Sequence, residues 1–218
     1  MSTVEKRRAR TDLDKAGRRF DIVDAARTTF DATELPAFTM DAVATKLGLA
    51  KGTLYRYFPT REALLLGVLH DDIDEWFHTV DSALGAARSD SAVATRLVST
   101  LIDRPRVMRL LAVLPSILEH NVPHQTAMEF KRFLLDRSAT TGSLIDAAVG
   151  ARAGSGVRLL VHLNAGVIGL YLGAHPAPVV AMVLVEDDFA PLRVDLRREL
   201  THLTRALVGA MPRKAPRS

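Results

Sequence analysis

The chain has 218 residues, which is enough for one domain or two modest ones with a sizeable hydrophobic core. Hydrophobic residues make up 48% and charged residues 25% of it, as is typical of a globular protein. It contains no cysteine, so a disulfide scaffold, a cysteine-ligated zinc site and a thiol nucleophile are excluded.

The net charge of +4 is distributed unevenly along the chain. Lys and Arg outnumber Asp and Glu by 12 to 9 over residues 1–62, and by 7 to 2 over residues 193–218. Between them, residues 63–192 hold 10 basic against 14 acidic residues. A basic end on an acidic middle favours contact with a nucleic acid, although solvated basic tails would give the same counts.

The N-terminus does not resemble a secretory signal, because residues 1–10 are polar and basic and no apolar run follows them. The most apolar window, residues 157–173, is interrupted by Arg158, His162 and Asn164. At about 17 residues it is marginal for spanning a bilayer. We therefore predict a buried helix there, no membrane partner and a cytoplasmic protein.

The first third of the chain predicts short helices separated by clear breaks. A disordered basic arm is expected over 1–15, followed by a helix with an apolar face that ends near Pro36. The residues spaced like one face of this helix are Phe20, Val23, Ala26, Arg27 and Phe30. Thr39 is a good N-cap for a second helix that ends at Gly48, and a third covers about 51–57. Thr60 caps a longer fourth helix that runs to about residue 84.

The rest of the chain also has helical periodicity, with no convincing strand and no internal repeat. Helices are expected at about 91–102, 105–120, 123–149, 156–173 and 188–210. Pro115 lies inside a helical pattern and should kink or split it. The stretch with Pro176 and Pro178 is predicted to be a loop. The predicted fold is all-α, with about nine helices.

Residues 38–66 have the form of a helix-turn-helix, in which the second helix enters the major groove of DNA by its N-terminal end. Apolar side chains must hold the two helices at a fixed angle, and Val43, Leu47, Leu54 and Phe58 meet this requirement. Short, hydroxylated or basic side chains must face outward. The requirement for outward-facing side chains is met by Lys51, Thr53, Tyr55, Arg56 and Tyr57. Gly52 allows the backbone to approach DNA closely.

The same stretch resembles the TetR family of bacterial transcriptional repressors, over roughly residues 16–66. The residues that carry the resemblance are Phe38-Thr39-Met40, Ala42-Val43-Ala44, Leu47-Gly48-Leu49, Lys51-Gly52-Thr53-Leu54-Tyr55-Arg56-Tyr57-Phe58 and Thr60-Arg61-Glu62-Ala63-Leu64. The resemblance implies that Thr39 caps the second helix and touches a phosphate. It implies that Lys51, Gly52 and Thr53 open the recognition helix, and that Tyr55, Arg56, Tyr57 and Arg61 contact DNA.

One position departs from the family pattern, because Ala50 stands where Ser or Thr often caps the recognition helix. The missing cap costs about 1 kcal/mol, and it puts a phosphate contact at this position in doubt. Several nearby side chains also have two possible roles. One of Tyr55 and Tyr57 could belong to the core, and Arg56 could be a solvated charge. Lys6, Arg7, Arg8 and Arg10 could enter a minor groove or form a solvated tail.

The expected domains are the arm at 1–15, a helix-turn-helix domain at 16–62, a ligand-binding and dimerisation domain at 63–210, and a basic tail at 211–218. By resemblance, the fifth to eighth helices form the ligand-binding core. The candidate lining residues are Trp76, Phe77, Met108, Leu111, Leu114, Leu118, His120, His124, Met128, Phe130, Phe133, His162 and Tyr171. An apolar cavity with a few polar groups suits a small molecule, although such residues are also common in a plain core.

The last two predicted helices are expected to form the interface of a homodimer, in a four-helix bundle. The interface candidates are Leu160, Gly166, Gly169, Leu200, Leu203 and Leu207. Glycines along helix 156–173 would let a neighbouring helix approach closely. The alternative is that both helices bury their apolar faces within one protomer.

No catalytic motif is found, so an enzyme is not expected. His120 and His124 have only Glu119 nearby as a further ligand, and no metal or other cofactor is predicted. The function predicted is that of a homodimeric repressor, released from a palindromic DNA operator by a hydrophobic small-molecule effector. The alternative is an architectural or constitutive DNA-binding protein without an effector.

Overall fold

The computed structural model describes residues 3–115 and 119–215, and in these ranges the chain forms ten α-helices and no strand longer than an isolated bridge. This confirms the all-α prediction. The described residues form two compact units, one of residues 3–71 with 119–127 and one of residues 72–115 with 128–215. We call them the N-terminal and the C-terminal unit.

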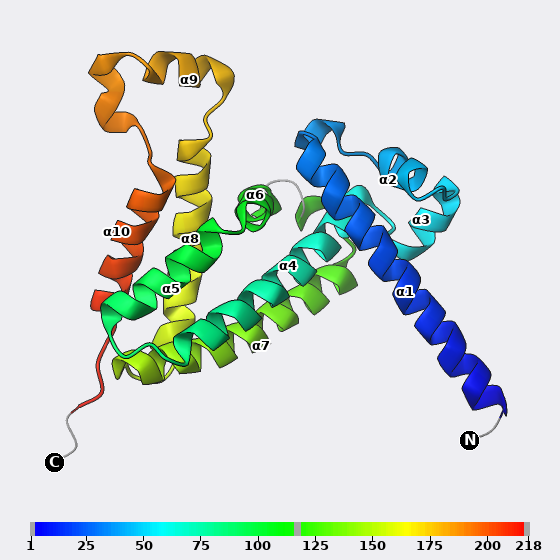
Figure 1. Ribbon diagram of the computed structural model, residues 1–218, viewed down its shortest axis with the longest axis horizontal. Coiled ribbons are helices and arrows are strands. Elements are labelled where there is room, and N and C mark those ends of the chain that lie inside the picture. The colour runs from blue at the N-terminus through cyan, green and yellow to red at the C-terminus, as the bar shows by residue number, and fades with distance from the viewer. Residues whose placement is uncertain (1–2, 116–118, 216–218) are drawn as a thin grey trace. The chain divides into compact units, whose positions relative to one another are not determined.

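The N-terminal unit holds three whole helices and the first part of a fourth, together with residues 124–127 of the later helix α7 (His124–Val149) (Figure 1). In chain order they are α1 (Thr3–Ala32), the 3₁₀ turn η1 (Leu35–Ala37), α2 (Met40–Lys46), α3 (Lys51–Tyr57) and the start of α4 (Arg61–Leu84). The 3₁₀ turn η3 (Glu119–Asn121) also belongs to this unit. Helix α1 begins at Thr3, whereas the sequence predicted a disordered arm over 1–15.

The core of the N-terminal unit forms where α1 meets α2, α3 and α4. Phe30 and Phe38 pack edge to face at 6.1 Å, and both are fully buried. The ring of Phe58 lies beneath Arg19, with 5.2 Å between the guanidinium carbon and the ring centroid. A Cβ on Gly67 would lie 2.9 Å from the Phe58 ring, so only glycine lets this ring sit against α4. Phe20, expected on the apolar face of α1, is exposed instead, and Ile22 is buried.

The predicted helix boundaries around α2, α3 and α4 are confirmed in detail. The Thr39 hydroxyl accepts a hydrogen bond of 3.1 Å from the Ala42 amide, and Gly48 has a φ of 62°. At the start of α4, the Thr60 hydroxyl accepts from the Ala63 amide at 3.0 Å and donates to the carbonyl of Asn121 at 3.0 Å. These contacts satisfy backbone groups that helix ends otherwise leave without partners.

The C-terminal unit contains the rest of α4 and six further helices. These are α5 (Asp90–Ile102), α6 (Pro105–Val113), α7 (His124–Val149), α8 (Ser155–Ala174), α9 (Pro178–Leu184) and α10 (Leu196–Gly209), with the 3₁₀ segment η4 (Asp187–Leu192) before α10. Helix α10 packs against α5 and α8, and α6 packs against α8. The buried residues of α10, Leu200, Thr204 and Val208, recur every four residues and form one face.

Helices α7 and α8 approach so closely that their backbones touch. A Cβ on Gly156 would lie 2.1 Å from the carbonyl oxygen of Gly142. The buried carboxylate of Asp146 accepts hydrogen bonds from the amides of Gly154 (2.8 Å) and Gly156 (2.7 Å), at the N-terminus of α8. A negative charge at this end of a helix also interacts favourably with the helix dipole.

Part of the predicted C-terminal tail is attached to this helix turn. The amide of Lys214 donates to the carbonyl of Gly150 at 3.0 Å, and Arg152 donates to Pro212 at 2.8 Å. Arg213 pairs with Asp90 and donates to the carbonyl of Val149. The guanidinium of Arg213 and the backbone amide of Lys214 therefore attach this segment to the rest of the C-terminal unit.

Proline positions explain where the later helices differ from the prediction. Helix α6 ends at Val113, before Pro115, so the predicted helix 105–120 is too long. The predicted helix 188–210 is divided into η4, which contains Pro191, and α10. Helix α9 was expected to be a loop, but Pro178 starts this helix, because proline fits the first helical turn.

Candidate nucleic-acid interface and ligand cavity

The N-terminal unit presents one face of α3 to solvent and packs the opposite face on α2 and α4. Leu54 is fully buried, as are Val43 and Ala44 of α2. On the other face, Lys51, Gly52, Tyr55 and Arg56 are exposed. The buried residues fix the angle of α3, and the exposed ones form a short surface of one ammonium, one guanidinium, one phenol and bare backbone.

Gly52 lies in the first turn of α3 and is exposed. A Cβ at Gly52 would meet nothing within 4 Å, so the glycine is not required by packing inside the chain. Its absence of a side chain leaves the backbone open to a ligand. An anion is the ligand that such a helix start prefers.

Lys51 is held at the start of α3 by a charged partner on α2. Its Nζ lies 2.8 Å from Oδ2 of Asp41, and both side chains are more than half exposed. The hydrogen bond to Asp41 is the main cause that raises the pKa of Lys51 above its ordinary value. The ammonium therefore stays charged at neutral pH, but in the free protein it is partly neutralised.

The remaining predicted contact residues lie around this surface with different exposure. Thr39 is exposed at the N-cap of α2. Thr53 and Tyr57 are half-buried, and Thr53 accepts a long hydrogen bond of 3.4 Å from Arg56. Arg61 is half-buried and pairs with Glu62 at 3.0 Å. Of the two tyrosines, Tyr55 thus points more fully outward.

Helix α3 has no side-chain cap. Ala50 occupies the N-cap position in an extended conformation, with φ −64° and ψ 138°, and makes no capping hydrogen bond. Its backbone conformation is the one a capping serine would adopt. The prediction that Ala50 provides no side-chain cap is confirmed, and the Thr53 amide donates to the Ala50 carbonyl at 2.8 Å instead.

The C-terminal unit encloses an apolar cavity of about 320 Å³ between α4, α5, α6, α7 and α8. Trp76, Phe77 and Leu111 lie on its wall, as does Leu114. These four residues were predicted from the sequence. The other lining residues were not predicted, and they are Ile73, Leu101, Val107, Lys131, Leu134, Leu135, Ser138, Val157, Leu160, Val161, Leu163, Asn164 and Val167.

Several predicted ligand residues do not line this cavity. His120, His124, Met128 and His162 do not line it, and none of them is buried. Phe133 is half-buried and Phe130 is buried, but neither contributes to the wall. Leu118 lies outside the described residues. Met108 and Tyr171 line a different, more open hollow near the start of α10. Residue type alone could not distinguish the residues that line the cavity from those that do not, because the rotation of each helix about its axis decides which side chains face inward.

The cavity has its polar groups at one side, between α7 and α8. Lys131 and Asn164 are exposed there and Ser138 is half-buried. Trp76 of α4 is a buried wall residue, and its indole Nε1 donates a 3.0 Å hydrogen bond to the Thr100 hydroxyl. Arg137 lies over the outer face of the Phe77 ring, 5.4 Å from its centroid, and pairs with Asp74. The cavity can therefore hold an apolar molecule with one polar group directed to the opening.

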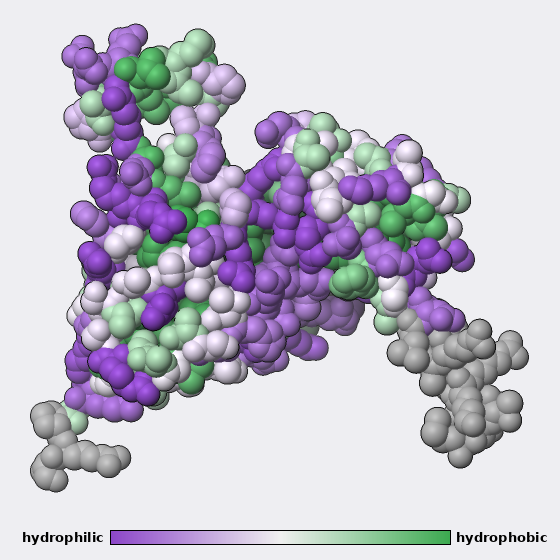
Figure 2. Space-filling view, viewed as in Figure 1, coloured by the Kyte–Doolittle hydropathy of each residue, from purple (hydrophilic) through white to green (hydrophobic). Residues whose placement is uncertain are grey.

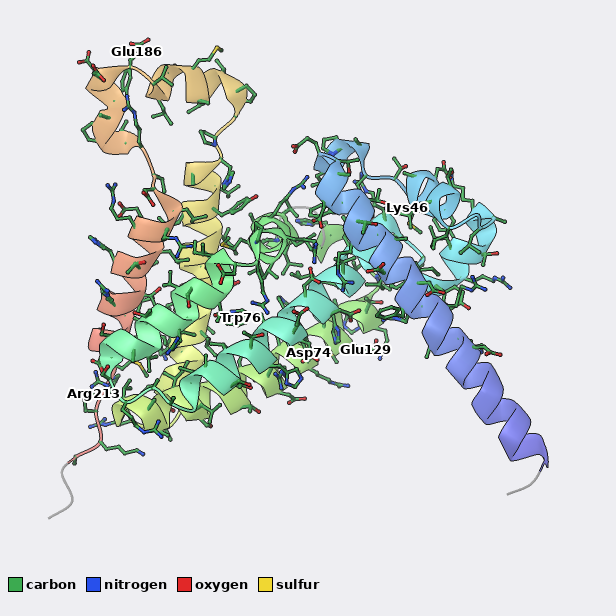
Figure 3. All side chains as sticks on the ribbon, viewed as in Figure 1. Lys46, Asp74, Trp76, Glu129, Glu186 and Arg213 are labelled. Atoms are coloured by element: carbon green, nitrogen blue, oxygen red, sulfur yellow. The ribbon has the colours of Figure 1, made fainter. Side chains whose placement is uncertain are left out.

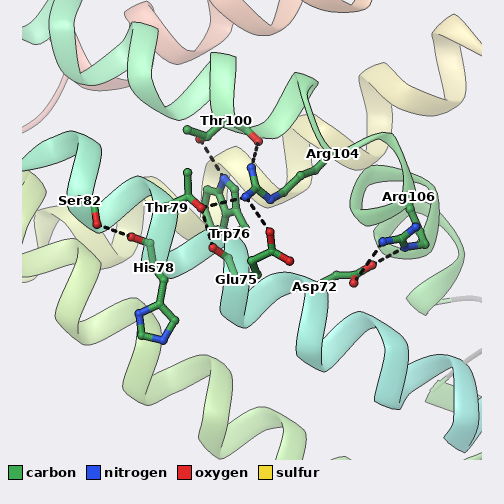
Figure 4. Close-up of polar contacts among 9 residues, drawn as sticks. All are labelled: Asp72, Glu75, Trp76, His78, Thr79, Ser82, Thr100, Arg104 and Arg106. Carbon is green, nitrogen blue, oxygen red and sulfur yellow. Dashed lines mark hydrogen bonds and ion pairs between the residues drawn. The ribbon is translucent and has the colours of Figure 1, made fainter. Parts of the chain in front are cut away.

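Two arginines connect α4 to the α5–α6 turn beside the cavity (Figure 4). Arg106 pairs with the buried carboxylate of Asp72, with 2.5 Å between Nε and Oδ2. Arg104 donates to the hydroxyl of Thr79 at 2.8 Å and to the carbonyl of Thr100 at 3.2 Å. Because α4 is one continuous helix from Arg61 to Leu84, it carries residues of both the N-terminal unit and the cavity wall.

The residues predicted at a dimer interface divide into two groups. Leu160 and Leu200 are buried within the chain itself, so they are not available to a second copy. Leu203 and Leu207 are not buried, and Leu203 packs on Gly166, where a Cβ would lie 2.2 Å from its Cδ2. Gly169 is exposed, and a Cβ there would meet nothing within 4 Å. Gly166 thus serves packing within the chain, whereas Gly169 faces outward.

Comparison with known sequences identifies both parts of the chain. The family described as bacterial regulatory proteins, tetR family, matches residues 22–68. The family described as tetracyclin repressor-like, C-terminal domain, matches residues 70–212. The HTH-type transcriptional repressor KstR2 of Rhodococcus jostii (strain RHA1) is 29% identical over 86 residues. That match covers 39% of this chain and 42% of the repressor's length.

Solved structures share the fold at low sequence identity. A putative TetR-family regulator from Mesorhizobium loti MAFF303099 has a TM-score of 0.52 at 17% identity, over 89% of this chain and 95% of that one. The regulator FadR from Bacillus subtilis, solved with stearoyl-CoA, has a TM-score of 0.52 at 14% identity, over 88% and 97% of the two chains. Together with the two family matches, these findings show that the chain belongs to the TetR family of DNA-binding transcriptional regulators.

Proposed function

We propose that the protein is a homodimeric repressor that binds a palindromic DNA operator and is released from it by an apolar small-molecule effector. The observation that carries the proposal is the α2–α3 pair, which presents Lys51, Tyr55 and Arg56 around the open backbone of Gly52. In a helix-turn-helix this end of the second helix enters the major groove. Thr39, Thr53, Tyr57 and Arg61 surround it and would contact phosphates and sugars, which fix the protein's position on the duplex.

The outward face of α8 supports the homodimer. Val161, Ala165, Gly169 and Leu172 are exposed at helical spacing, and Ala165 and Gly169 would let a second helix approach closely. Among the described residues, α8 is also the one helix long and apolar enough to cross a membrane by length and composition. We attribute its apolar character to pairing with a second copy in the cytoplasm. Two recognition helices would then read half-sites about one turn of DNA apart.

The cavity supports the effector. Its wall is mostly apolar, and its polar residues Lys131, Ser138 and Asn164 come from α7 and α8, two of them exposed to solvent. This arrangement suits an apolar chain or ring with one anionic or hydrogen-bonding group. Long-chain acyl compounds are one such class, and stearoyl-CoA, present in the FadR structure, is therefore a candidate to test. The effector would change α4, which carries Ile73, Trp76 and Phe77 of the wall, and so change the separation of the two recognition helices.

The test of DNA binding uses fluorescence anisotropy with the intergenic DNA upstream of the gene and with random DNA of equal length. We expect the upstream DNA to bind at least about a thousandfold more tightly. Lys51→Ala with Tyr55→Ala should remove this preference, whereas Arg132→Ala, which removes an exposed charge on α7, should leave it unchanged. Equal affinity of the wild type for both DNAs would refute the proposal that the protein is a repressor.

A second measurement addresses the effector. Palmitate and stearoyl-CoA are titrated into the complex of protein and upstream DNA, and release is followed by the same anisotropy. Release by either compound, with loss of the response in Leu111→Trp, supports the cavity as the effector site. If an apolar ligand binds the protein but does not change its affinity for DNA, the alternative of a constitutive regulator without an effector is favoured.

A further inference from the structure

A second hollow of the C-terminal unit lies at the start of α10 and has a volume of about 680 Å³. It shares no lining residue with the apolar cavity. This volume is within the range of small-molecule sites and corresponds to about twenty groups the size of a water molecule. In Figure 2, hydrophilic residues cover the start of α10, and hydrophobic ones lie between it and α8. The hollow therefore combines polar and apolar surface.

One side of the hollow is a pair of stacked rings on α8. Tyr171 and His175 are one helical turn apart, and their ring centroids are 4.1 Å apart at an interplanar angle of 22°. Nδ1 of His175 lies 2.8 Å from the carbonyl oxygen of Tyr171. Because a carbonyl can only accept, Nδ1 carries the hydrogen of this bond, and Nε2 is left to interact with another molecule. The bond fixes the imidazole, so the pair is a preformed surface on which a planar ring can stack.

Apolar side chains from the end of α5 and the start of α6 form another side of the hollow. They belong to Ile102, Pro105 and Met108. Met108 is only 2% exposed, so its position is fixed by packing. A thioether also makes favourable contacts with aromatic rings. A ring in the hollow can therefore contact apolar atoms as well as the stacked pair.

The wall of the hollow carries more positive than negative charge. Among the described residues it has three arginines, Arg193, Arg197 and Arg198, against the carboxylate of Asp195. Asp195 already accepts a 2.9 Å hydrogen bond from the Arg198 amide as the N-cap of α10, and the Arg198 guanidinium pairs with Glu199 at 2.9 Å. Within residues 3–115 and 119–215, the Arg197 side chain has neither a hydrogen bond nor an ion pair. Its charge is available to an anion that enters the hollow.

Arg193 brings a second positive charge to the hollow from the segment before α10. Its guanidinium donates to the carbonyls of Leu184 (2.6 Å), Val185 (2.7 Å) and Glu186 (3.0 Å). These carbonyls have no net charge, so they hold the guanidinium in place without neutralising it. It also pairs with Asp187 at 3.9 Å, but that carboxylate is fully exposed and contributes little. Figure 3 shows Glu186 at the far end of the α9–η4 segment that Arg193 holds.

The hollow and the apolar cavity adjoin along two helices. On α6, Val107 lines the cavity and Met108 lines the hollow. On α8, Val167 lines the cavity, and Tyr171 one turn later lines the hollow. The four α8 residues proposed for the dimer contact do not line the hollow, so that contact does not use its wall.

We propose that this hollow is a second ligand site, which binds a small planar ring that carries a phosphate or carboxylate group. The ring stacks on Tyr171 and His175, and Arg193 and Arg197 bind the anionic group, for which guanidinium groups are well suited. The site goes beyond the proposed function, because its ligand is charged and polar whereas the cavity takes an apolar effector. Since both sites use α6 and α8, binding at one can change the affinity of the other, and such coupling is reciprocal.

Isothermal titration calorimetry of the full-length protein tests the site, with adenosine 5′-monophosphate and 2-naphthoate as probes. We expect saturable binding of at least one of them at millimolar concentration, with one molecule per chain. The two probes distinguish a phosphate from a carboxylate ligand. Their uncharged counterparts, adenosine and 2-naphthol, should bind at least about tenfold more weakly, because they keep the ring and lose the anion.

Two substitutions locate the bound probe. Arg197→Ala and His175→Ala should each weaken binding by about tenfold, because one removes an anion-binding group and the other a stacking partner. Both side chains are exposed, so neither change should unfold the protein. Arg205→Ala is the matched control, since Arg205 is exposed about two turns further along α10 and does not line the hollow. It should leave the affinity unchanged.

The opposite results would overturn the second site. These are no saturable binding of either probe, equal affinity for the uncharged counterparts, or binding that survives Arg197→Ala and is lost in Leu111→Trp, which would place the probe in the apolar cavity. Anisotropy with upstream DNA on the same preparations tests the proposed function separately. A protein that binds upstream DNA but neither probe leaves the proposed function intact, and one that binds a probe in the hollow but not upstream DNA leaves the second site intact.

Discussion

At the residue scale, the ion pair between Lys51 and Asp41 would limit the affinity of the proposed DNA-binding surface. The Lys51 ammonium pairs with Asp41 of α2 in the free protein. A phosphate that binds Lys51 must compete with this carboxylate, and Asp41 also repels the phosphate. The ion pair is exposed and screened by salt, so its effect should be modest.

We predict that Asp41→Asn raises the affinity for DNA by about two- to fivefold, for specific and random sequences alike. Lys51→Ala should weaken both and reduce the slope of log affinity against log salt by about 1. Anisotropy titrations at several salt concentrations measure both effects. In the Lys51→Ala background, Asp41→Asn should have a smaller effect. An equally large gain there would show that Asp41 acts without Lys51.

The pKa of Lys51 sets the pH range of this effect. Because the bond to Asp41 raises it above the ordinary lysine value, the ion pair is fully present at neutral pH and is lost only as the pH rises through the raised pKa. Affinity differences between pH 6 and pH 8 should therefore not arise from Lys51.

At the element scale, helix α3 lacks an N-cap at Ala50, in a backbone conformation that suits one. We predict that Ala50→Ser raises the free energy of unfolding by about 1 kcal/mol, because a serine hydroxyl can accept from an amide of the first turn. Urea denaturation measures the change, and Thr39→Ala, which removes the existing cap of α2, should lower stability by a similar amount. No gain in Ala50→Ser would mean that the first turn of α3 cannot reach the hydroxyl.

Two glycines of helix α8, Gly156 and Gly169, have different surroundings. We predict that Gly156→Ala destabilises the protein by about 1–3 kcal/mol, because its Cβ would overlap the backbone of Gly142 and neither helix can move easily. Thermal and urea denaturation measure the loss.

Gly169→Ala is the matched comparison, with the same substitution in the same helix. Within the chain it should stabilise α8 by about 0.5–1 kcal/mol through helix propensity. If Gly169 lies at the dimer contact, light scattering should at the same time show weaker dimerisation. Strong destabilisation of the separated protomer would contradict an outward-facing Gly169.

At the scale of the whole molecule, the single helix α4 carries residues of the N-terminal unit and residues of the cavity wall in the C-terminal unit. Asp72 and Trp76 connect it to α6 and α5, through Arg106 and Thr100. A ligand that displaces Trp76 or Phe77 acts on the same helix that Thr60 and Arg61 begin. Coupling between ligand and DNA binding must then be reciprocal.

We predict that an effector which releases the protein from DNA weakens DNA binding by about 5- to 150-fold. Saturating upstream DNA should weaken the binding of that effector by the same factor. Trp76 is the single tryptophan and lines the cavity, so its fluorescence reports ligand binding directly. Asp72→Asn should reduce this coupling while leaving the fluorescence response in the absence of DNA. Unequal factors in the two directions would show that a second ligand site contributes.

The sequence by itself determined the all-α fold, the limits of α2, α3 and α4, and the residues that α3 presents at its first turn. These depend on local signals, such as the Thr39 cap, the Gly48 turn and the Pro59 stop, which act within a few residues. It also indicated the family, since the residues that a helix-turn-helix requires lie close together in the chain.

Only the tertiary structure decided which side of each long helix faces the cavity, its own chain or solvent. The rotation of each helix about its axis brings Trp76 and Phe77 to the cavity wall but leaves His162 away from it. The rotation of α8 likewise packs Gly166 against Leu203 and leaves Gly169 exposed. Helix α9 was missed because Pro176 and Pro178 are typical of a loop. That its apolar side chains are exposed became evident only from the structure, in which no other part of the C-terminal unit buries them. Contacts between segments distant in sequence decide these questions, and no local pattern encodes them.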